Sequence, residues 1–249
     1  MVSKSTLMCT FAFGRQIKNN SLNMNTKNKN EVLKRLQNEA KLFLGERKLV
    51  FNNIVINPKE IEVYYWEKDV FEDSSVHRNA LQQNNKNHFY IHRWGYKKED
   101  AYKGGNYPGL DFVVSGEEGV YYTYLIRSAV IDDNLIVGPH KVLTTVLESS
   151  GLEKEQLENV IVELQEEKSL CDVLFSERIN LGKNAKEYTG EELRGVLCDE
   201  YFRKAKYPLK ERMIVEKILK SKICKDGAVE YAKANLGYVP SSIKKQYCE

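Results

Sequence analysis

The run VYYTYLIRSAVI, residues Val120–Ile131, is rich in β-branched and aromatic side chains and predicts a β-strand. A second run, IEVYYW at Ile61–Trp66, has the same character, and its alternation places Glu62 on the same strand face as Tyr64. Each run also carries one charged side chain in an apolar setting, Glu62 in the second and Arg127 in the first. The two runs therefore predict a β-rich centre with two candidate functional charges.

Further strands are predicted around this centre. They are Leu49–Ile56, His88–Trp94 and Leu110–Ser115, and the Ile61–Trp66 strand is extended back to Glu60. Turn residues separate the strands at Asn57-Pro58, Gly104-Gly105-Asn106 and Ser115-Gly116. Because parallel neighbours need a crossover of a dozen or more residues, the short connections favour antiparallel pairing.

Helical periodicity lies on both sides of the strands. Residues 31–45 have apolar side chains near helical spacing and end at Gly45, and Pro139 begins a second amphipathic helix. Residues 153–168 form an acidic segment with helical spacing, and residues 174–181 are predicted to return to the sheet. From Glu191 onward the apolar spacing predicts helices.

These patterns predict an α+β fold: a single domain with a mixed, mainly antiparallel curved β-sheet flanked by helices, plus a helical C-terminal extension. The first 30 residues are rich in Asn, Lys, Ser and Thr and show no periodicity. We therefore divide the chain into a disordered leader (1–30), an α+β domain (31–195) and a basic helical extension (196–249).

The 249 residues are enough to bury a sizeable core without disulfides. The five cysteines are odd in number, widely spaced and free of any Cys-x-x-Cys pair, which favours a reducing cytoplasm over a secreted scaffold. No stretch approaches the roughly 20 apolar residues of a membrane helix. We expect a cytoplasmic protein that does not enter membranes, associated with the nucleoid if the source is bacterial.

The formal net charge of +3 is the balance of unequal segments. Residues 1–50 carry 10 basic and 3 acidic side chains, residues 51–200 carry 16 and 27, and residues 201–249 carry 12 and 5. A polyanion such as nucleic acid would favour the basic ends, because Lys and Arg release counterions from phosphates. Solvated helix faces and a flexible leader explain the same charge without a partner.

Glu62 and Arg127 are the first candidates for chemistry. A carboxylate that shares a strand face with large aromatic side chains is costly to bury unless it is paired or functional. A lone Arg in an apolar strand likewise needs an anionic partner if it points inward, and Glu62 is the obvious one. The alternative is that Ile61 and Val63 face the core while Glu62 faces water.

The histidines give weaker signals. His77 lies in a polar loop, where a lone histidine is most often a surface residue. His88, His92 and His140 follow no recognised ligand spacing, so no metal site is predicted. Gly104-Gly105 beside Lys103 lacks the fingerprint of a phosphate loop.

Five motifs in order give the chain a family resemblance. They are Glu62-Val63-Tyr64, His77-Arg78-Asn79, the aromatic run Phe89–Gly95, Leu125–Ala129 with its Leu-Ile-Arg-Ser-Ala sequence, and Gly138–Leu143 with its Gly-Pro-His-Lys-Val-Leu sequence. This series resembles the alkyladenine DNA glycosylase family, also called the methylpurine or 3-methyladenine type. That family has Glu-Ala-Tyr, His followed by Arg-Asn, a Tyr-rich strand ending in Tyr-Gly, Leu-Leu-Arg-Ala and Gly-Pro-x-Lys-Leu. A weaker similarity to its Arg-Val-Gly-Ile segment follows at Arg178–Glu187, and the resemblance covers residues 32–195.

The resemblance implies a monofunctional hydrolase of base excision repair, which flips an alkylated purine or another damaged base out of double-stranded DNA. Glu62 would activate a water, and Arg127 would help to hold it. Tyr64 and His77 would line the base pocket, and Trp94 would fill the gap left in the duplex. The phosphate contacts would come from basic residues around the pocket, namely Arg78, Arg93, Lys97, Lys98 and Lys141. Neither metal nor cofactor is implied, no lysine lies in a recognisable nucleophile setting for strand cleavage, and a monomer is expected.

The chain departs from the family pattern in ways that leave the modified base open. An insert, Tyr96–Pro108, separates Trp94-Gly95 from the next strand, and Phe112-Val113-Val114 stands where the family often has an Asn-containing run. Two alternatives remain at this point. One is a non-catalytic nucleic-acid-binding module on the same fold, and the other is an N-glycosidase of free nucleosides or nucleotides, in which Trp94 would stack on the base.

Overall fold

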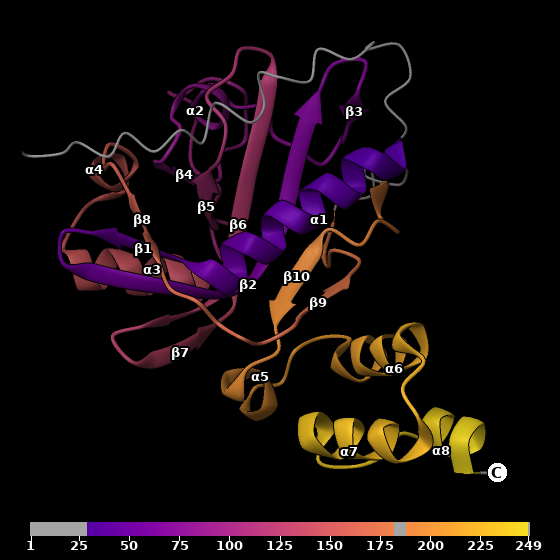
Figure 1. Ribbon diagram of the computed structural model, residues 1–249. Helices are drawn as coiled ribbons and strands as arrows, with labels where there is room; N and C mark the ends of the chain where they lie inside the picture. Colours follow the sequence, from indigo (N-terminus) through magenta and orange to yellow (C-terminus); the bar gives the residue numbers. More distant parts are fainter. Residues whose placement is uncertain (1–28, 182–187, 249) are drawn as a thin grey trace, which may run out of the picture.

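A computed structural model describes residues 29–181 and 188–248, so the predicted leader lies outside the described residues except for its last two positions. The fold is α+β, with a curled antiparallel half-barrel sheet, flanking helices and a group of C-terminal helices (Figure 1). Every strand pair in the described part is antiparallel, so the parallel component of the predicted mixed sheet is not found there.

Two long strands, β2 (Ile54–Glu67) and β6 (Val120–Ile131), pair along their lengths at the centre of the sheet. The sheet order is β4-β5-β6-β2-β1-β8, with β10 also paired to β2 and β9 to β10. The other strands are β1 (Arg47–Phe51), β3 (Phe71–Glu72), β4 (Phe89–Ile91), β5 (Leu110–Val113), β7 (Asn134–Val137), β8 (Glu163–Glu166), β9 (Val173–Ser176) and β10 (Arg194–Leu197). The bounds of β6 are those that the sequence predicts.

The predicted single strand Leu49–Ile56 is instead a tight hairpin of β1 and β2. Asn52 and Asn53 form its turn with φ of 44° and 65°. Two central residues with positive φ are the signature of the two-residue type I′ turn, and Asn tolerates that conformation better than most residues. The predicted break at Asn57-Pro58 does not occur, because β2 runs through it.

An irregularity in the β2–β6 ladder changes the alternation of side chains. The register shifts between Pro58 and Ile61, so that Ile61 pairs with Ile126 while Glu60 pairs with Ser128. Arg127 therefore has no partner of its own in the ladder. Such bulges re-aim side chains and are common beside functional sites. Here, odd-numbered β2 residues after the bulge face the apolar core, and Glu62 and Tyr64 face the other side.

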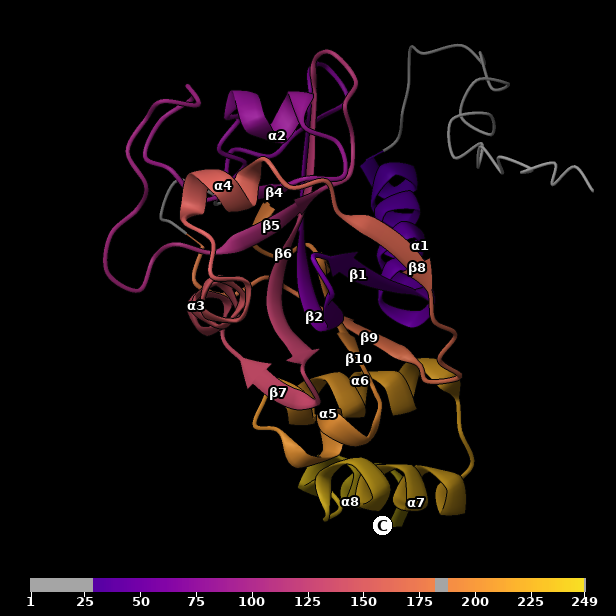
Figure 2. The ribbon, with the colours of Figure 1, turned by 90° about the vertical axis from the view of Figure 1, so that its left-hand side faces the viewer.

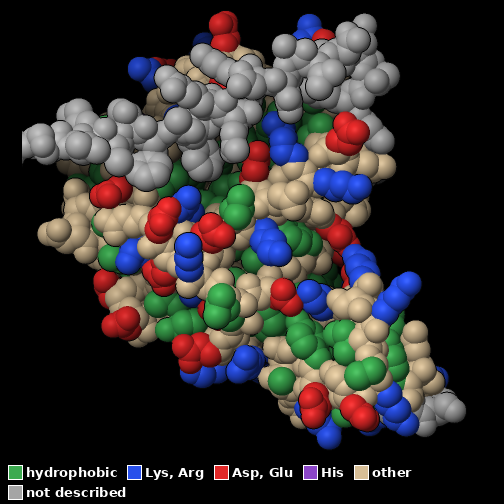
Figure 3. All heavy atoms as spheres, in the orientation of Figure 1, with side chains coloured by type: hydrophobic (Ala, Val, Ile, Leu, Met, Phe, Trp, Pro, Cys, Tyr) green, Lys and Arg blue, Asp and Glu red, His purple; other side chains and the backbone are tan. Residues whose placement is uncertain are grey.

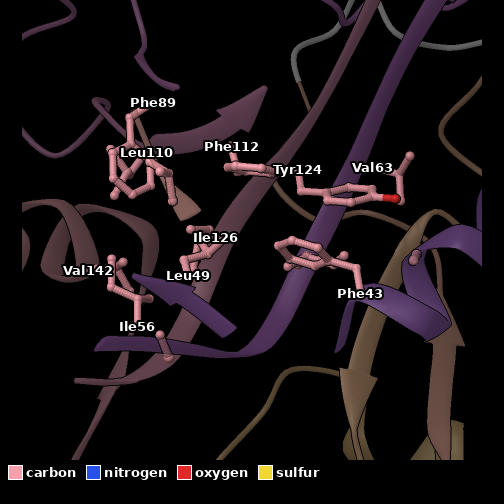
Figure 4. Close-up of a cluster of buried hydrophobic side chains, with 14 of the residues drawn as sticks. Phe43, Leu49, Ile56, Val63, Phe89, Leu110, Phe112, Tyr124, Ile126 and Val142 are labelled. Atoms are coloured by element: carbon pink, nitrogen blue, oxygen red, sulfur yellow. The ribbon is translucent and has the colours of Figure 1, made fainter. Parts of the chain in front are cut away.

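The apolar face of the sheet is covered by α1 (Lys29–Glu46) and α3 (Pro139–Ser150), both close to their predicted positions. Phe43 of α1 packs against Tyr124 and Phe112, with ring centroids 4.6 and 5.6 Å apart. Figure 4 shows these rings beside Val63 in one continuous cluster. The core thus lies on one face of the long strands and leaves the opposite face for polar groups.

The second half of the chain differs most from the sequence prediction. The predicted helix at 153–168 is the short α4 (Lys154–Glu158) followed by β8, and the predicted helical start after Glu191 is strand β10. A short apolar run fits either state by periodicity alone. The segment 194–197 is a strand because it pairs with β2 on one side and β9 on the other. The return to the sheet predicted at 174–181 is confirmed in part by β9.

Helices fill the C-terminal region as predicted, beginning after β10. They are α5 (Glu200–Lys204), α6 (Lys210–Ser221), α7 (Lys225–Leu236) and α8 (Ser241–Cys248). A further short helix, α2 (Ala80–Asn84), lies in the first half of the chain. The four C-terminal helices enclose a second hydrophobic cluster that also includes Leu174 and Val196 of the sheet. Figures 1 and 2 both place these helices together beyond β9 and β10. No helix in the described part is long and apolar enough to cross a membrane.

Candidate active site

A pocket of about 860 Å³ lies on the polar face of the β2–β6 strands. Its lining comes from strands β2, β5 and β6, from the loops at 74–77 and 103–109, from the start of α3 and from residues 179–181. Of the predicted site residues, Glu62, Tyr64, His77, Arg127 and Lys141 all line this one pocket. The structure therefore brings these five residues together, whereas the other predicted site residues are not part of the lining: Arg78, Arg93, Trp94, Lys97 and Lys98.

Glu62 lies on the floor of this pocket with its side chain fully buried. Its Oε1 accepts a hydrogen bond from the backbone N–H of Ile179 at 2.9 Å and lies 3.3 Å from Nη1 of Arg127. Its Oε2 accepts a hydrogen bond from the Tyr64 hydroxyl at 3.1 Å. The expectation that Glu62 and Arg127 converge in one cleft is met, and the alternative in which Glu62 faces water is wrong.

Arg127 bridges two carboxylates. Its Nε donates to Oε1 of Glu60 at 3.2 Å, and the same oxygen accepts from Nε of Arg194 at 2.7 Å. Two carboxylates and two guanidinium groups thus form a compact, charge-balanced set, which we call the carboxylate wall (Glu60, Glu62, Arg127 and Arg194). Removing one member of such a buried set leaves an uncompensated charge.

The C-terminal region supports the back of the carboxylate wall. Nη1 of Arg194 donates to the Pro208 carbonyl at 3.2 Å and to Oγ of Ser176 at 3.0 Å. The hydroxyls of Tyr207 and Ser128 lie 3.1 Å apart. The segment predicted as a separate extension therefore contacts the residues that hold Arg127 in place.

Tyr64 is a hydrogen-bond donor at the pocket floor. Burial raises the pKa of Tyr64 well above its usual value, and the Glu62 carboxylate raises it further. The guanidinium of Arg178 lies 4.8 Å from the centre of the Tyr64 ring and forms a buried ion pair with Asp73 at 2.6 Å. Tyr64 is therefore held neutral, with its ring fixed against a cation.

A second part of the pocket is built from His77, His92, Lys103 and Asp111, which we call the histidine wall. Nδ1 of His77 lies 3.1 Å from the Tyr90 hydroxyl, and Nε2 of His92 lies 2.7 Å from Oδ1 of Asp111. Burial, with His92 and Lys103 nearby, lowers the pKa of His77 to about 3. His77 is therefore neutral at physiological pH and accepts or donates a hydrogen bond without carrying charge.

Lys103 comes from the insert Tyr96–Pro108 and ends inside the pocket. Its Nζ donates to Nε2 of His77 at 2.7 Å. Burial lowers the pKa of Lys103, and the nearby Asp111 opposes that change. The insert is thus part of the pocket wall, which its sequence does not indicate.

Tyr107 lines the pocket, and Trp94 lies beside it outside the lining. Trp94 and Tyr107 are 67% and 73% exposed, and their ring centroids are 6.5 Å apart. The Lys103 amine lies 5.5 Å from the centre of the Trp94 ring. A large exposed aromatic beside a pocket is available to stack on a base or to enter a duplex.

The basic residues predicted to contact phosphates separate into two groups. Arg78, Lys97, Lys98 and Lys141 are exposed. Arg93 is only 5% exposed, and its two terminal nitrogens, Nη1 and Nη2, donate to the Glu158 carboxylate at 2.9 and 2.7 Å. A buried, paired guanidinium cannot reach a phosphate, so the prediction for Arg93 is wrong, and its role is to hold α4 against β4.

The surface charge gives no broad basic face in the view of Figure 1. Lys and Arg side chains there are interspersed with Asp and Glu, including over the C-terminal helices (Figure 3). Within residues 29–181 and 188–248, no group of three or more His, Cys, Asp or Glu side chains is arranged to hold a metal ion. The predicted similarity at Arg178–Glu187 lies outside the described residues from position 182 onward.

Sequence reasoning missed five residues of the two walls: Glu60, Arg194, His92, Asp111 and Lys103. Asp111 had a usable signal, because it is a carboxylate within the apolar strand LDFV. Arg194 is likewise a charged side chain in an apolar segment, RGVL, but the sequence predicts a helix there and not a strand. No protein-family model matches the chain, and none of the curated proteins is similar to it in sequence.

Proposed function

We propose that the chain is a DNA glycosylase, which hydrolyses the N-glycosidic bond of a modified base flipped out of duplex DNA. The observation that supports this most is the buried Glu62 carboxylate beside Arg127 on the floor of an open pocket with an aromatic rim. The five motifs, which occur in the same order as in the alkyladenine DNA glycosylase family, also support the proposal.

In the proposed reaction, Glu62 takes a proton from a water molecule held between it and Arg127. The water oxygen bonds to C1′ of the deoxyribose, while the C1′–N bond breaks and its electrons leave with the base. A neutral lesion leaves as an anion that takes a proton from solvent, and Glu62 returns its own proton to solvent. Positive charge develops on the sugar as the bond breaks, and a nearby carboxylate stabilises it. The products are the free base and an abasic site in an intact strand.

The rim and the exposed cations serve DNA binding in this proposal. Trp94 enters the duplex where the base has left, which offsets part of the unstacking cost. Arg78, Lys97, Lys98 and Lys141 contact phosphates near the pocket mouth. Hydrolysis uses only water as co-substrate, and we assign no step to a metal or cofactor.

The test is release of free base from duplexes that each carry one modified base. We expect wild-type protein to release base from at least one duplex, and Glu62→Gln to lower the rate by about 100-fold or more while duplex binding is kept. Glu163→Gln is the matched control, because Glu163 is an exposed glutamate on β8, remote from the pocket lining. Urea unfolding of both variants verifies that they are folded.

The outcomes separate the candidate functions. Binding of duplexes without release of any base from a broad panel would favour the non-catalytic module. Release from free nucleosides but not from duplexes would favour the nucleoside N-glycosidase, in which Trp94 stacks on the substrate base.

A further inference from the structure

The charges that face the pocket are unequally compensated. In the carboxylate wall, Glu60 and Glu62 are matched by Arg127 and Arg194. In the histidine wall, Asp111 is 1% exposed, and its two oxygens are occupied by His92 at 2.7 Å and Thr123 at 2.8 Å. Lys103 is the charged group of that wall that remains open to an incoming ligand.

Lys103 has hydrogen-bonding capacity to spare. An ammonium group has three N–H donors, and among the described residues the Lys103 amine has one hydrogen-bond partner, His77. Its amine takes part in none of the ion pairs of the described residues, and the Asp111 carboxylate, which is bound to His92, acts on it only as a nearby charge. Its remaining donors can therefore bind an acceptor on a molecule in the pocket.

The chemistry of this wall distinguishes two kinds of damaged base. Purines alkylated on a ring nitrogen carry a positive charge, whereas deaminated bases are neutral and present carbonyl oxygens. An ammonium group in a half-buried wall repels the first kind and donates a hydrogen bond to the second. A hydrogen bond to a charged donor is also stronger than one between neutral groups.

We propose that Lys103 is a specificity-determining residue, which selects neutral bases with a carbonyl acceptor and disfavours cationic alkylated purines. This inference rests on the proposed glycosylase function. Its new element is the residue that discriminates between bases, because Lys103 belongs to the Tyr96–Pro108 insert, which is not part of the family pattern.

The experiment compares single-turnover release of hypoxanthine and 7-methylguanine from otherwise identical duplexes. Both purines carry a carbonyl at C6, and they differ in charge. The variants are Lys103→Met, which removes the charge, and Lys103→Arg, which keeps it. Lys97→Met is the matched control, because Lys97 lies in the same insert but does not line the pocket.

We expect the wild type to favour hypoxanthine, and Lys103→Met to lower the ratio of hypoxanthine to 7-methylguanine release by about 10- to 100-fold. Lys103→Arg should keep most of the preference, and Lys97→Met should change both rates equally. A wild-type preference for 7-methylguanine, or an unchanged ratio in folded Lys103→Met, would overturn the inference while leaving the glycosylase function in place. Failure to release either base or any other base would instead remove the proposed function itself.

Discussion

The two walls of the pocket are built in different ways. The carboxylate wall stands on paired strands, and each of its charged groups has an opposite charge within 3.3 Å. The histidine wall takes Lys103 from a connection between β4 and β5, and that amine has one hydrogen-bond partner in the described part of the chain. The first wall holds its charged side chains in fixed positions, and the second keeps a donor available.

This difference suggests a division of labour. Strands position side chains more rigidly than loops, so a group that must aim at one atom benefits from a strand. Loops vary more easily and often carry recognition residues on a rigid scaffold. We therefore expect substitutions in the carboxylate wall to affect stability and rate together, and those in the histidine wall to affect substrate choice.

The largest expected effect is that of Arg194→Met. Loss of this buried guanidinium leaves Glu60 with one of its two cationic partners, which should lower the free energy of unfolding by about 3–5 kcal/mol. Urea unfolding measures the change. Arg212→Met is the control, because Arg212 forms exposed ion pairs with Glu177 and Glu216 and should cost at most about 1 kcal/mol. Equal losses in the two variants would contradict the importance of the buried set.

The next effect concerns pH and the histidine wall. The pKa of His77 is about 3 in the folded protein against 6.5 for a free side chain, so the unfolded chain binds a proton first as the pH falls. Stability from His77 is therefore complete above pH 6.5 and is lost as the pH falls toward 3. Between pH 7 and pH 5 we expect a loss of about 2 kcal/mol that is absent in His77→Gln, measured by urea unfolding at each pH. A variant with the same pH dependence as wild type would show that His77 is not buried and neutral.

A smaller effect is expected at the rim. Trp94→Ala should lower base release from duplexes by about tenfold, and release from single strands by less, because only the duplex has a gap to fill. Tyr96→Ala is the control, since Tyr96 is 63% exposed but lies against Arg78, whereas Trp94 lies against the pocket residues Tyr107 and Lys103. Equal losses on the two substrates would remove the intercalating role of Trp94.

The smallest effect belongs to the exposed cations. Lys141→Met should weaken duplex binding modestly and reduce the slope of log affinity against log salt by about one unit. Titrations at several salt concentrations measure this slope. The same substitution at Lys222, exposed on the C-terminal helices, should leave the slope unchanged if DNA binds only near the pocket.

The parts of the fold with strong local signals could be predicted from sequence. The long strand β6 and the Pro139 start of α3 follow from residue type and capping alone. The pairing of Glu62 with Arg127 followed from the cost of leaving either charge unpaired in an apolar strand. These predictions depend on the residue types of one segment, or of two strands that pair directly.

The rest depended on contacts between distant residues. Strand β10 has an apolar pattern too short to separate strand from helix, and its pairing with β2 joins positions more than 130 residues apart. Lys103 reaches His77 only because the insert folds back over the pocket. Arg93 had a partner, Glu158, that lies 65 residues further along the chain.

The bulge between Pro58 and Ile61 sets a limit on how this chain can change in length. Deleting one residue there would reverse which side chains of the following strand face the core, exchanging Glu62 and Tyr64 with Val63 and Tyr65. Within the Tyr96–Pro108 connection, Tyr102 and Lys103 have defined partners in Glu158 and His77, whereas the exposed residues 104–107 carry no such constraint. Insertions and deletions should therefore be tolerated at 104–107 and rejected in β2, which a library of single-residue deletions scored for folded protein would reveal.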